Sequence, residues 1–500
     1  MTATPWSAAA VTRPELAPLL LAYVRARRWF RGKSRTIGSA RVADLIALNL
    51  PGDDAAPSAL ALLEIAYDRG EPEPYAVPIT QVSDRTLATL ETTVPHAIID
   101  RRRGLVDGLA TGHAAKALMA IMRQRRTLRG ETGQLGGEGS PLLDTIAAPA
   151  LVAEVPQVEQ SNSTSNFGGR VLLKIYRQPA PGPNPEVEVG QFLTRRARVG
   201  LAPRVLGTLT YVTSDGTPSS VGIAHEFLAC EGDAWSLALR ELGATFDRAG
   251  DRAPPETADD QVHQMMGRFA ALASTLGRRT GELHLALSGS KDDPDFAPTP
   301  LTSGDRAVLV ARVGGMLEEM SALLPSLVGN AKLAAVLSDF RDQPLDVMKT
   351  RTHGDLHLGQ VLARGDDFAF IDFEGEPARP AAERRAQASP LRDVMGMVRS
   401  FDYAPATALR ETERSDSPHL RAWGRLWTQH MTQRYLSTYL DTVAGAPFVP
   451  ARPAQLALML SFYELEKVIY EVAYEANNRP DWLAIPMAGL RRLAGLGGDR

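Results

Sequence analysis

The stretch Thr352–Glu374 decides the fold, and it reads T-H-G-D-L-H-L-G-Q-V-L-A-R-G-D-D-F-A-F-I-D-F-E. It contains an aspartate, Asp355, and an amide side chain five residues later, Gln360. Apolar residues on both sides of the turn-forming Gly365-Asp366-Asp367 predict a short hairpin. A second aspartate, Asp372, stands at the end of the second apolar strand.

This pattern predicts phosphotransfer chemistry. A carboxylate at the end of an apolar strand is costly to bury unless positive charge lies nearby, and a magnesium ion held by carboxylates and phosphate oxygens would supply it. Protein kinases combine a loop H-R-D-x-x-x-x-N with an aspartate on the next hairpin for this purpose. We therefore predict Asp355 as the general base, Gln360 and Asp372 as magnesium ligands, and His353 as the residue that orients the loop. Either aspartate alone would more simply cap a helix or open a turn.

The composition is that of a globular protein of more than one domain. The chain has 500 residues and a net charge of −3, which gives no reason to expect nucleic acid or an anionic membrane as a partner. No apolar run approaches the roughly 18 residues of a membrane span. The single cysteine, Cys230, excludes an internal disulfide framework, and we expect a cytoplasmic protein. Lysines are rare, seven against forty-eight arginines, so a lysine at a strategic position is informative.

The order of predicted elements indicates an α+β protein with a bilobal, eukaryotic-protein-kinase-like fold. We predict an N-terminal strand-rich cap and an intermediate subdomain over residues 1–148, a kinase-like N-lobe over 149–232, and a mostly helical C-lobe with the catalytic loop over 233–500. The predicted elements of the first two parts are a helix over 14–28, strands over 40–50, 59–67 and 74–82, a helix over 105–126, an exposed loop over 130–141, and strands over 151–155, 171–176 and 221–228.

Several residues of the strand-rich part suit a nucleotide. Lys174 alternates out of the apolar run Val171–Tyr176, like the strand lysine that holds the α- and β-phosphates in kinases. The helix after Pro185 begins with Glu186 and Glu188, and the pattern does not decide which of them pairs with Lys174. Hydroxyl groups, among them Ser161 and Ser163, lie where a phosphate-covering loop is expected. Backbone groups of His225–Leu228, those of Glu226 and Leu228 included, are candidates for contacts with adenine.

The last long helix carries a polar and aromatic face. Lys467, Glu471, Tyr474 and Asn478 follow one another at helical spacing, and Tyr470 flanks them. Such a face offers hydrogen bonds to sugar hydroxyl groups and an aromatic surface to the C–H side of a sugar ring. A surface helix with ordinary Glu–Lys pairs is the alternative.

With these residues in place, the chain resembles the bacterial maltokinases, which are related to the aminoglycoside phosphotransferases of the protein-kinase-like superfamily. The resemblance is strongest to the maltokinase domain fused to trehalose synthase. The blocks that carry it are Arg27–Lys33, Glu159–Ser163, Gly182–Pro185 with Glu188, Leu276–Thr280 with Glu282–His284, His353–Gln360, Ile371–Pro377, Arg392–Val394, Arg399–Tyr403, Glu466–Lys467, Tyr470–Glu471, Tyr474–Glu475 and Asn477–Trp482.

The resemblance implies an ATP- and Mg²⁺-dependent kinase that converts maltose to α-maltose 1-phosphate for α-glucan and trehalose metabolism. It implies that Glu188 is the partner of Lys174, that the helix face over 467–478 binds the sugar, and that the protein associates with trehalose synthase. Two alternatives stay open: a kinase for another sugar, notably glucosamine, and a non-catalytic kinase-like partner of trehalose synthase.

Overall fold

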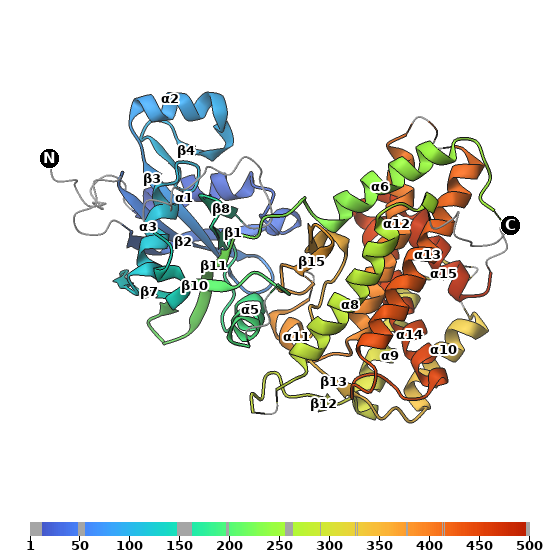
Figure 1. Cartoon of the computed structure of the whole chain (residues 1–500). Helices are drawn as coiled ribbons and strands as arrows, with labels where there is room; N and C mark the ends of the chain where they lie inside the picture. Colours follow the sequence, from blue (N-terminus) through green and yellow to red (C-terminus); the bar gives the residue numbers. More distant parts are fainter. Residues whose placement is uncertain are drawn as a thin grey trace. The chain divides into compact units, whose positions relative to one another are not determined.

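The structure is a computed structural model that describes residues 13–48, 56–147, 163–196, 200–255, 264–290, 292–325, 327, 329–376, 379–412, 414 and 416–496. It divides into two compact units, one formed by 1–196 with 203–229 and the other by 197–202 with 230–500. The first unit is rich in antiparallel strands and the second is mostly helical, which confirms the predicted α+β class (Figure 1). The finer division at residues 148 and 232 stays a prediction.

The strand-rich unit begins with a five-stranded antiparallel sheet in the order β1-β2-β3-β5-β4. Helix α1 packs against this sheet through Leu16, Leu20 and Val24, which are fully buried. The elements are α1 (Arg13–Arg25), η1 (Gly32–Ser34), β1 (Ile37–Ala47), β2 (Ser58–Tyr67), β3 (Glu73–Gln81), α2 (Asp84–Thr93), η2 (Pro95–Ala97), β4 (Ile98–Asp100) and β5 (Leu105–Asp107).

A second antiparallel sheet of six strands follows in the order β6-β7-β10-β11-β9-β8. Helix α3 packs against strands of both sheets and shares one apolar core with them. The elements are α3 (His113–Arg123), β6 (Thr127–Arg129), β7 (Gly133–Gly139), α4 (Pro141–Asp144), β8 (Ser163–Phe167), β9 (Val171–Ile175), α5 (Pro185–Arg195), β10 (Val205–Thr213) and β11 (Pro218–Glu226).

Two sequence-based predictions in this unit are wrong. The predicted loop over 130–141 contains strand β7, which pairs with β6 and β10. Glycine suits this strand because a Cβ at Gly137 or Gly139 would lie 2.7 Å from backbone atoms of α3. The predicted helix over 105–126 is shorter, because its first residues form β5 and pair with β3. The predicted strand over 151–155 lies outside the described residues.

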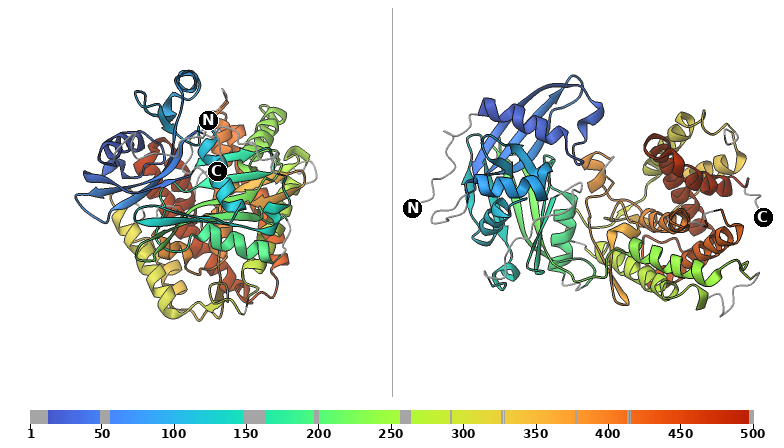
Figure 2. Two further views of the ribbon diagram at one scale, coloured as in Figure 1. Left: turned by 90° about the vertical axis from the view of Figure 1, so that its left-hand side faces the viewer. Right: turned by 90° about the horizontal axis from the view of Figure 1, so that it is seen from above.

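Long helices form the second unit. Figure 2 shows this unit in two further views, in green to red. Helix α8 packs along α13, and α12 packs against α6, α13 and α14. The elements are α6 (Ala234–Ala249), α8 (Phe269–Leu287), β12 (Thr299–Pro300), α9 (Ser303–Glu319), α10 (Ala331–Asp342), β13 (Met348–Lys349), η4 (Leu358–Gln360), β14 (Val361–Arg364), β15 (Asp367–Phe370), α11 (Ala381–Arg385), α12 (Leu391–Arg410), α13 (Pro418–Thr442), α14 (Pro453–Asn478), η5 (Pro480–Trp482) and α15 (Ala484–Leu493).

The hairpin that positions the candidate site is formed by β14 and β15, as the sequence predicts. Its register pairs Val361 with Phe370 and Arg364 with Asp367. Arg279 on α8 holds the turn end through both Nε and Nη2, which donate to the two carboxylate oxygens of Asp367. Among the described helices, none has both the length and the apolar character needed to cross a membrane.

The close approach of α8 and α13 gives a stability prediction. A Cβ at Gly277 would overlap the carbonyl oxygen of Tyr435 and lie 3.1 Å from the amide nitrogen of Tyr439. We expect Gly277→Ala to lower the free energy of unfolding by about 1–3 kcal/mol, as overpacking does. The matched control is Gly314→Ala on α9, where a Cβ meets nothing within 4 Å and helix propensity favours alanine by about 1 kcal/mol. Urea unfolding measures both variants, and equal effects would contradict the packing account.

Candidate active site

The loop that carries Asp355 is anchored by a buried carboxylate. The backbone N–H groups of His353 and Gly354 donate to Oδ2 and Oδ1 of Asp393, at 2.7 and 2.9 Å. Asp393 stands at the start of α12 and is 3% exposed. Gly354 has φ of +85°, a conformation that favours glycine. The anchor therefore fixes the backbone immediately before Asp355.

His284 on α8 completes the surroundings of this carboxylate. Its Nε2 lies 3.3 Å from Asp393 Oδ2, and its Nδ1 lies 3.0 Å from the hydroxyl group of Tyr439. Burial by itself raises the pKa of Asp393, but the interaction with His284 and the loop N–H groups outweigh it and hold the pKa below its usual value. Asp393 is therefore an ionised acceptor. Asp393 and His284 both lie in blocks of the family resemblance, but their sequence context alone predicts no role for either.

His353 connects the loop to the segment after β15. Its Nε2 lies 2.8 Å from the carbonyl oxygen of Ile371, and its ring packs 4.8 Å from that of Phe373. The side chain is almost fully buried. This placement suits the orienting role that the sequence predicts for His353, which stays a prediction.

Asp355 lies beside one of the predicted sugar-binding residues. Its Oδ1 is 3.8 Å from the ammonium nitrogen of Lys467 on α14, and both side chains are about a quarter exposed. Lys467 also lies over the ring of Tyr470, 5.0 Å from its centroid. The structure thus brings the predicted base together with two residues of the predicted acceptor face.

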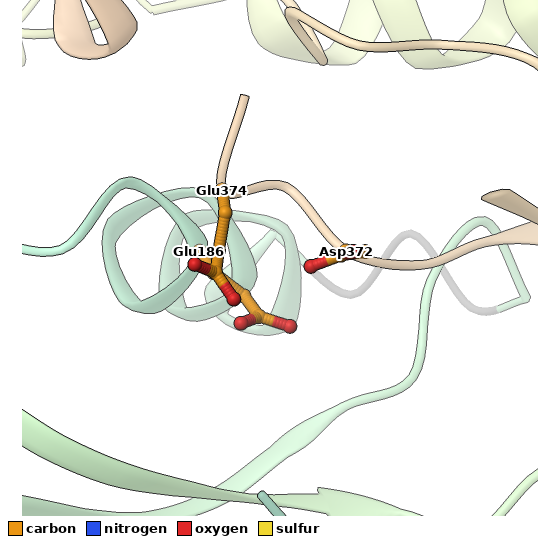
Figure 3. Close-up of side chains that lie close together, drawn as sticks. All are labelled: Glu186, Asp372 and Glu374. Atoms are coloured by element: carbon orange, nitrogen blue, oxygen red, sulfur yellow. The ribbon is translucent and has the colours of Figure 1, made fainter. Parts of the chain in front are cut away.

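The two predicted magnesium ligands are also neighbours. Gln360 Nε2 donates to Asp372 Oδ2 at 3.2 Å. Asp372 has φ of +64°, which is uncommon for a residue with a Cβ and is typical of functional sites. The carboxylate of Glu374 lies within 4.8 Å of that of Asp372, and both are labelled in Figure 3. An amide oxygen and one or two carboxylates form a donor set that fits Mg²⁺, which prefers hard oxygen ligands.

The predicted acceptor face of α14 divides into two parts. The rings of Tyr470 and Tyr474 stack at 6.3 Å, and Tyr474 is 44% exposed. Glu471 is buried instead and accepts a hydrogen bond from Nε of Arg399 at 2.9 Å, and Nη2 of the same guanidinium lies 2.8 Å from that carboxylate oxygen as an ion pair. Asn478 donates to the carbonyl oxygen of Tyr474 within the helix. Lys467, Tyr470 and Tyr474 thus form the accessible part, and Glu471 supports it from below.

Burial dominates the electrostatics of Glu471. It raises the pKa of this carboxyl group above the usual value, even though Arg399 lowers it. A group whose charge is already shared with Arg399 is poorly suited to bind a sugar directly. The prediction of Glu471 as a substrate contact stays untested, and the structure gives it a supporting position.

The lysine of the strand-rich unit is paired with Glu186. Lys174 Nζ donates to Glu186 Oε2 at 2.8 Å, and the hydroxyl group of Tyr176 donates to the same oxygen at 2.8 Å. His225 Nε2 lies 3.5 Å from the other carboxylate oxygen. This corrects the choice of Glu188 as the partner, because Asn184 caps α5 and the first turn then presents Glu186 to β9. Figure 3 labels Glu186 on α5.

Glu186 is ionised despite its burial. Burial raises its pKa, but the positive charge of Lys174 and the interaction with His225 lower it by more, so that the pKa lies well below the usual value. The acid therefore orients the side chain of Lys174 through this ion pair, as a phosphate-binding lysine requires.

The other predicted nucleotide contacts have mixed placements. Ser163 lies on strand β8 rather than on a loop, and its Oγ accepts from Arg177 Nε at 2.8 Å. The carboxylate of Glu226 at the end of β11 accepts two hydrogen bonds from Arg204, both at 2.7 Å. Leu228 follows β11 and is half-buried, and Ser161 lies outside the described residues. Contacts of these residues with a nucleotide stay predictions.

Comparison with known proteins gives relatives among sugar kinases. No family model matches the chain. It is 27% identical over 362 residues to a glucosamine kinase of Streptacidiphilus jiangxiensis, covering 70% of this chain and 75% of the relative. It is 26% identical over 347 residues to a glucosamine kinase of Mycolicibacterium smegmatis, covering 67% and 78%.

Solved structures agree on the fold. A glucosamine kinase in complex with glucosamine, ADP and inorganic phosphate matches with a TM-score of 0.62 at 20% identity, over 94% of this chain and 98% of that one. A second glucosamine kinase structure matches with a TM-score of 0.63 at 21% identity, over 100% of both chains. The chain thus has the fold of the kinase-like phosphotransferases. The sequence relatives and these structures are named glucosamine kinases, where the sequence resemblance pointed to maltokinases.

The anchor at Asp393 gives a prediction for the variant Asp393→Asn. The amide would place an NH₂ group opposite one of two backbone N–H donors, which leaves a buried donor unsatisfied at a cost of about 1–3 kcal/mol. We expect kcat to fall roughly 10- to 100-fold, because the loop before Asp355 shifts, with nucleotide affinity retained. The control is Asp366→Asn, at the exposed hairpin turn. Equal kinetics for both variants would contradict the role of the anchor.

The same carboxylate predicts a pH dependence of stability. Its pKa is lowered in the folded chain, so it stabilises the fold above its unfolded pKa of about 4 and loses this contribution as the pH falls through the folded value. The difference in unfolding free energy between wild type and Asp393→Asn should therefore be complete at pH 7 and shrink below about pH 4. Urea unfolding of both proteins between pH 7 and pH 3 measures this difference. If the difference does not change with pH, it does not come from the titration of Asp393.

Proposed function

We propose that the chain is an ATP-dependent sugar kinase and that its acceptor is an amino sugar of the glucosamine type. The observation that carries the kinase assignment is Asp355, which lies on the loop anchored by Asp393, 3.8 Å from Lys467. The acceptor class rests on the two glucosamine kinase relatives, which each cover about two thirds of the chain.

In the proposed reaction the oxygen of a sugar hydroxyl group attacks the γ-phosphorus of ATP. Asp355 accepts the hydroxyl proton, and the bond from the γ-phosphorus to the oxygen it shares with the β-phosphate breaks, which releases ADP. His353 and Asp393 hold the base in position. Lys467 places a positive charge where the acceptor oxygen and the γ-phosphate would meet Asp355.

Two groups of residues are suited to the nucleotide. Lys174, oriented by Glu186, would bind phosphate oxygens. Gln360 and Asp372, with Glu374 near them, would hold magnesium. Magnesium would supply charge neutralisation on the phosphates. The positioning of the phosphates and the removal of the proton would come from the side chains named above.

Maltose is the second candidate acceptor, and an aromatic row favours it. The row continues from Tyr470 and Tyr474 to Arg479, which lies 5.5 Å from the Tyr474 ring centroid and 5.2 Å from that of Trp482. Tyr403 stacks on Trp482 at 6.5 Å. Such a row is longer than a single sugar ring needs. Association with trehalose synthase stays a prediction from the resemblance.

The carboxylates of α14 bear on the choice between an amino sugar and maltose. An ammonium group needs an acidic partner, but Glu466, Glu471 and Glu475 are each paired with arginine. If glucosamine is the acceptor, its ammonium group must therefore interact with an acid elsewhere, and Asp355 and Glu376 both lie beside the acceptor face.

The acceptor assay decides between these candidates. ADP release is measured with Mg-ATP and glucosamine, maltose, glucose, trehalose or an aminoglycoside, and the products are identified by phosphorus NMR. We expect turnover with glucosamine. Turnover with maltose alone would show that the acceptor is maltose and not an amino sugar. ATP binding without turnover on any acceptor would favour a non-catalytic kinase-like protein.

The general base gives a mutational prediction. Asp355→Asn should lower kcat by about 10²–10⁴-fold, because the hydroxyl proton loses its acceptor, while the affinity for Mg-ADP stays within about twofold. Asp481→Asn, an exposed aspartate after α14, is the matched control. Steady-state kinetics and calorimetric titration with Mg-ADP measure both, and full turnover in Asp355→Asn would refute the base assignment.

A further inference from the structure

The helical unit contains a cavity that the proposed reaction does not use. Its volume is about 470 Å³, within the range of small-molecule sites. Helix α9, the segment after β15, α11 and the start of α12 line it. None of the predicted acceptor residues lies in its wall, but Thr352 and Gly354 of the catalytic loop do.

The wall of this cavity is electropositive. Four guanidinium groups line it, from Arg312, Arg379, Arg384 and Arg392. Three carboxylates face them, those of Glu376 and Glu383 in the wall and that of Glu466 behind it. Lys349 and Asp305, also in the wall, pair with each other at 2.7 Å. Of the charged side chains in the wall itself, five are cationic and three are acidic.

The titration behaviour of the buried groups agrees with this charge count. Burial raises the pKa of Glu376 and of Glu466, yet nearby positive charges lower both below the usual value: Lys467 and then Arg392 for Glu376, and Arg392 and Arg312 for Glu466. The pKa of Arg312 is lowered, first by burial and then also by the like charges of Arg379 and Arg392. An anion in the cavity would relieve this repulsion.

The remaining wall suits a compact body with hydroxyl groups. Leu301, Val308 and Leu309 form an apolar side. Tyr463 is 2% exposed, and within the described residues its hydroxyl group makes no hydrogen bond of good geometry, although Ser389 lies close to it. Gln387 and Ser389 add polar groups to the same wall. A buried hydroxyl group without a partner costs free energy unless a ligand satisfies it.

We propose that this cavity is a binding site for a phosphorylated sugar. Arginine forks match the oxygens of a phosphate monoester, which carries up to two negative charges and can share several guanidinium groups. The apolar side and the hydroxyl group of Tyr463 would receive the sugar ring. A ligand there would touch the backbone of Gly354, next to Asp355, and so would lower turnover. This last effect rests on the proposed kinase activity, whereas the binding does not.

Calorimetric titration of the full chain tests the site without requiring turnover. The probes are glucose 6-phosphate, glucose and glucuronate. We expect glucose 6-phosphate to bind at least tenfold more tightly than either of the others. Val308→Trp fills the cavity from an exposed position on α9 and should weaken this binding at least tenfold. Leu323→Trp, at an exposed leucine outside the cavity, is the matched control and should leave it unchanged.

A variant that keeps the cavity open provides the charge test. Arg384→Gln should weaken the binding of glucose 6-phosphate at least fivefold and leave that of glucose unchanged. Equal affinity for glucose 6-phosphate in wild type and Val308→Trp would overturn the location of the site. If glucose or glucuronate binds as tightly as glucose 6-phosphate, the assignment of a phosphate ligand is overturned. If the wild-type chain binds glucose 6-phosphate but shows no kinase activity, only the proposed function is contradicted.

Discussion

The hydrogen bonds from the catalytic loop to Asp393 are the interaction on which the site depends. A carboxylate that is 3% exposed is tolerated because two backbone N–H groups and His284 satisfy it. The helices α8 and α12 supply these two side chains, so the packing of the helical unit fixes the loop. The loop in turn places Asp355 beside Lys467.

Arginine–carboxylate pairs extend the same logic through the helical unit. Arginine forms two parallel hydrogen bonds with a carboxylate and stays charged when buried, which lysine does less well. The acids Glu466, Glu471 and Glu475 on α14 each have arginine partners. Beside Asp355, the predicted base, the positively charged neighbour is instead a lysine, Lys467. The scarcity of lysine in the composition thus makes the two lysines of the candidate site, Lys174 and Lys467, informative.

The sequence predicts elements well where the pattern is local. The turn residues Gly365–Asp367 between two apolar runs correctly indicate the β14–β15 hairpin, and the hairpin brings Gln360 and Asp372 together. Local composition misleads at β7, where glycines signal a loop but in fact permit the close approach of α3. Periodicity also could not separate Glu186 from Glu188, because the pairing depends on how α5 meets β9.

Contacts between residues far apart in the chain could not be predicted from the sequence. Asp393 follows His353 by 40 residues and stands next to Arg392 at the start of α12, where it reads as an ordinary helix-start acid. Only the packed structure shows that its oxygens point at the loop. The cavity beside α9 has the same origin, since its arginines come from α9, the segment after β15, α11 and the start of α12.

Hydrogen–deuterium exchange of the catalytic loop tests the central claim most directly. The peptide that covers residues 350–358 would be followed by mass spectrometry in wild type and in Asp393→Asn. The amides of His353 and Gly354 should be protected in wild type and exchange at least tenfold faster in the variant, while peptides of α13 remain unchanged. Equal protection in both proteins would contradict the account, because the loop would then be held by something other than Asp393.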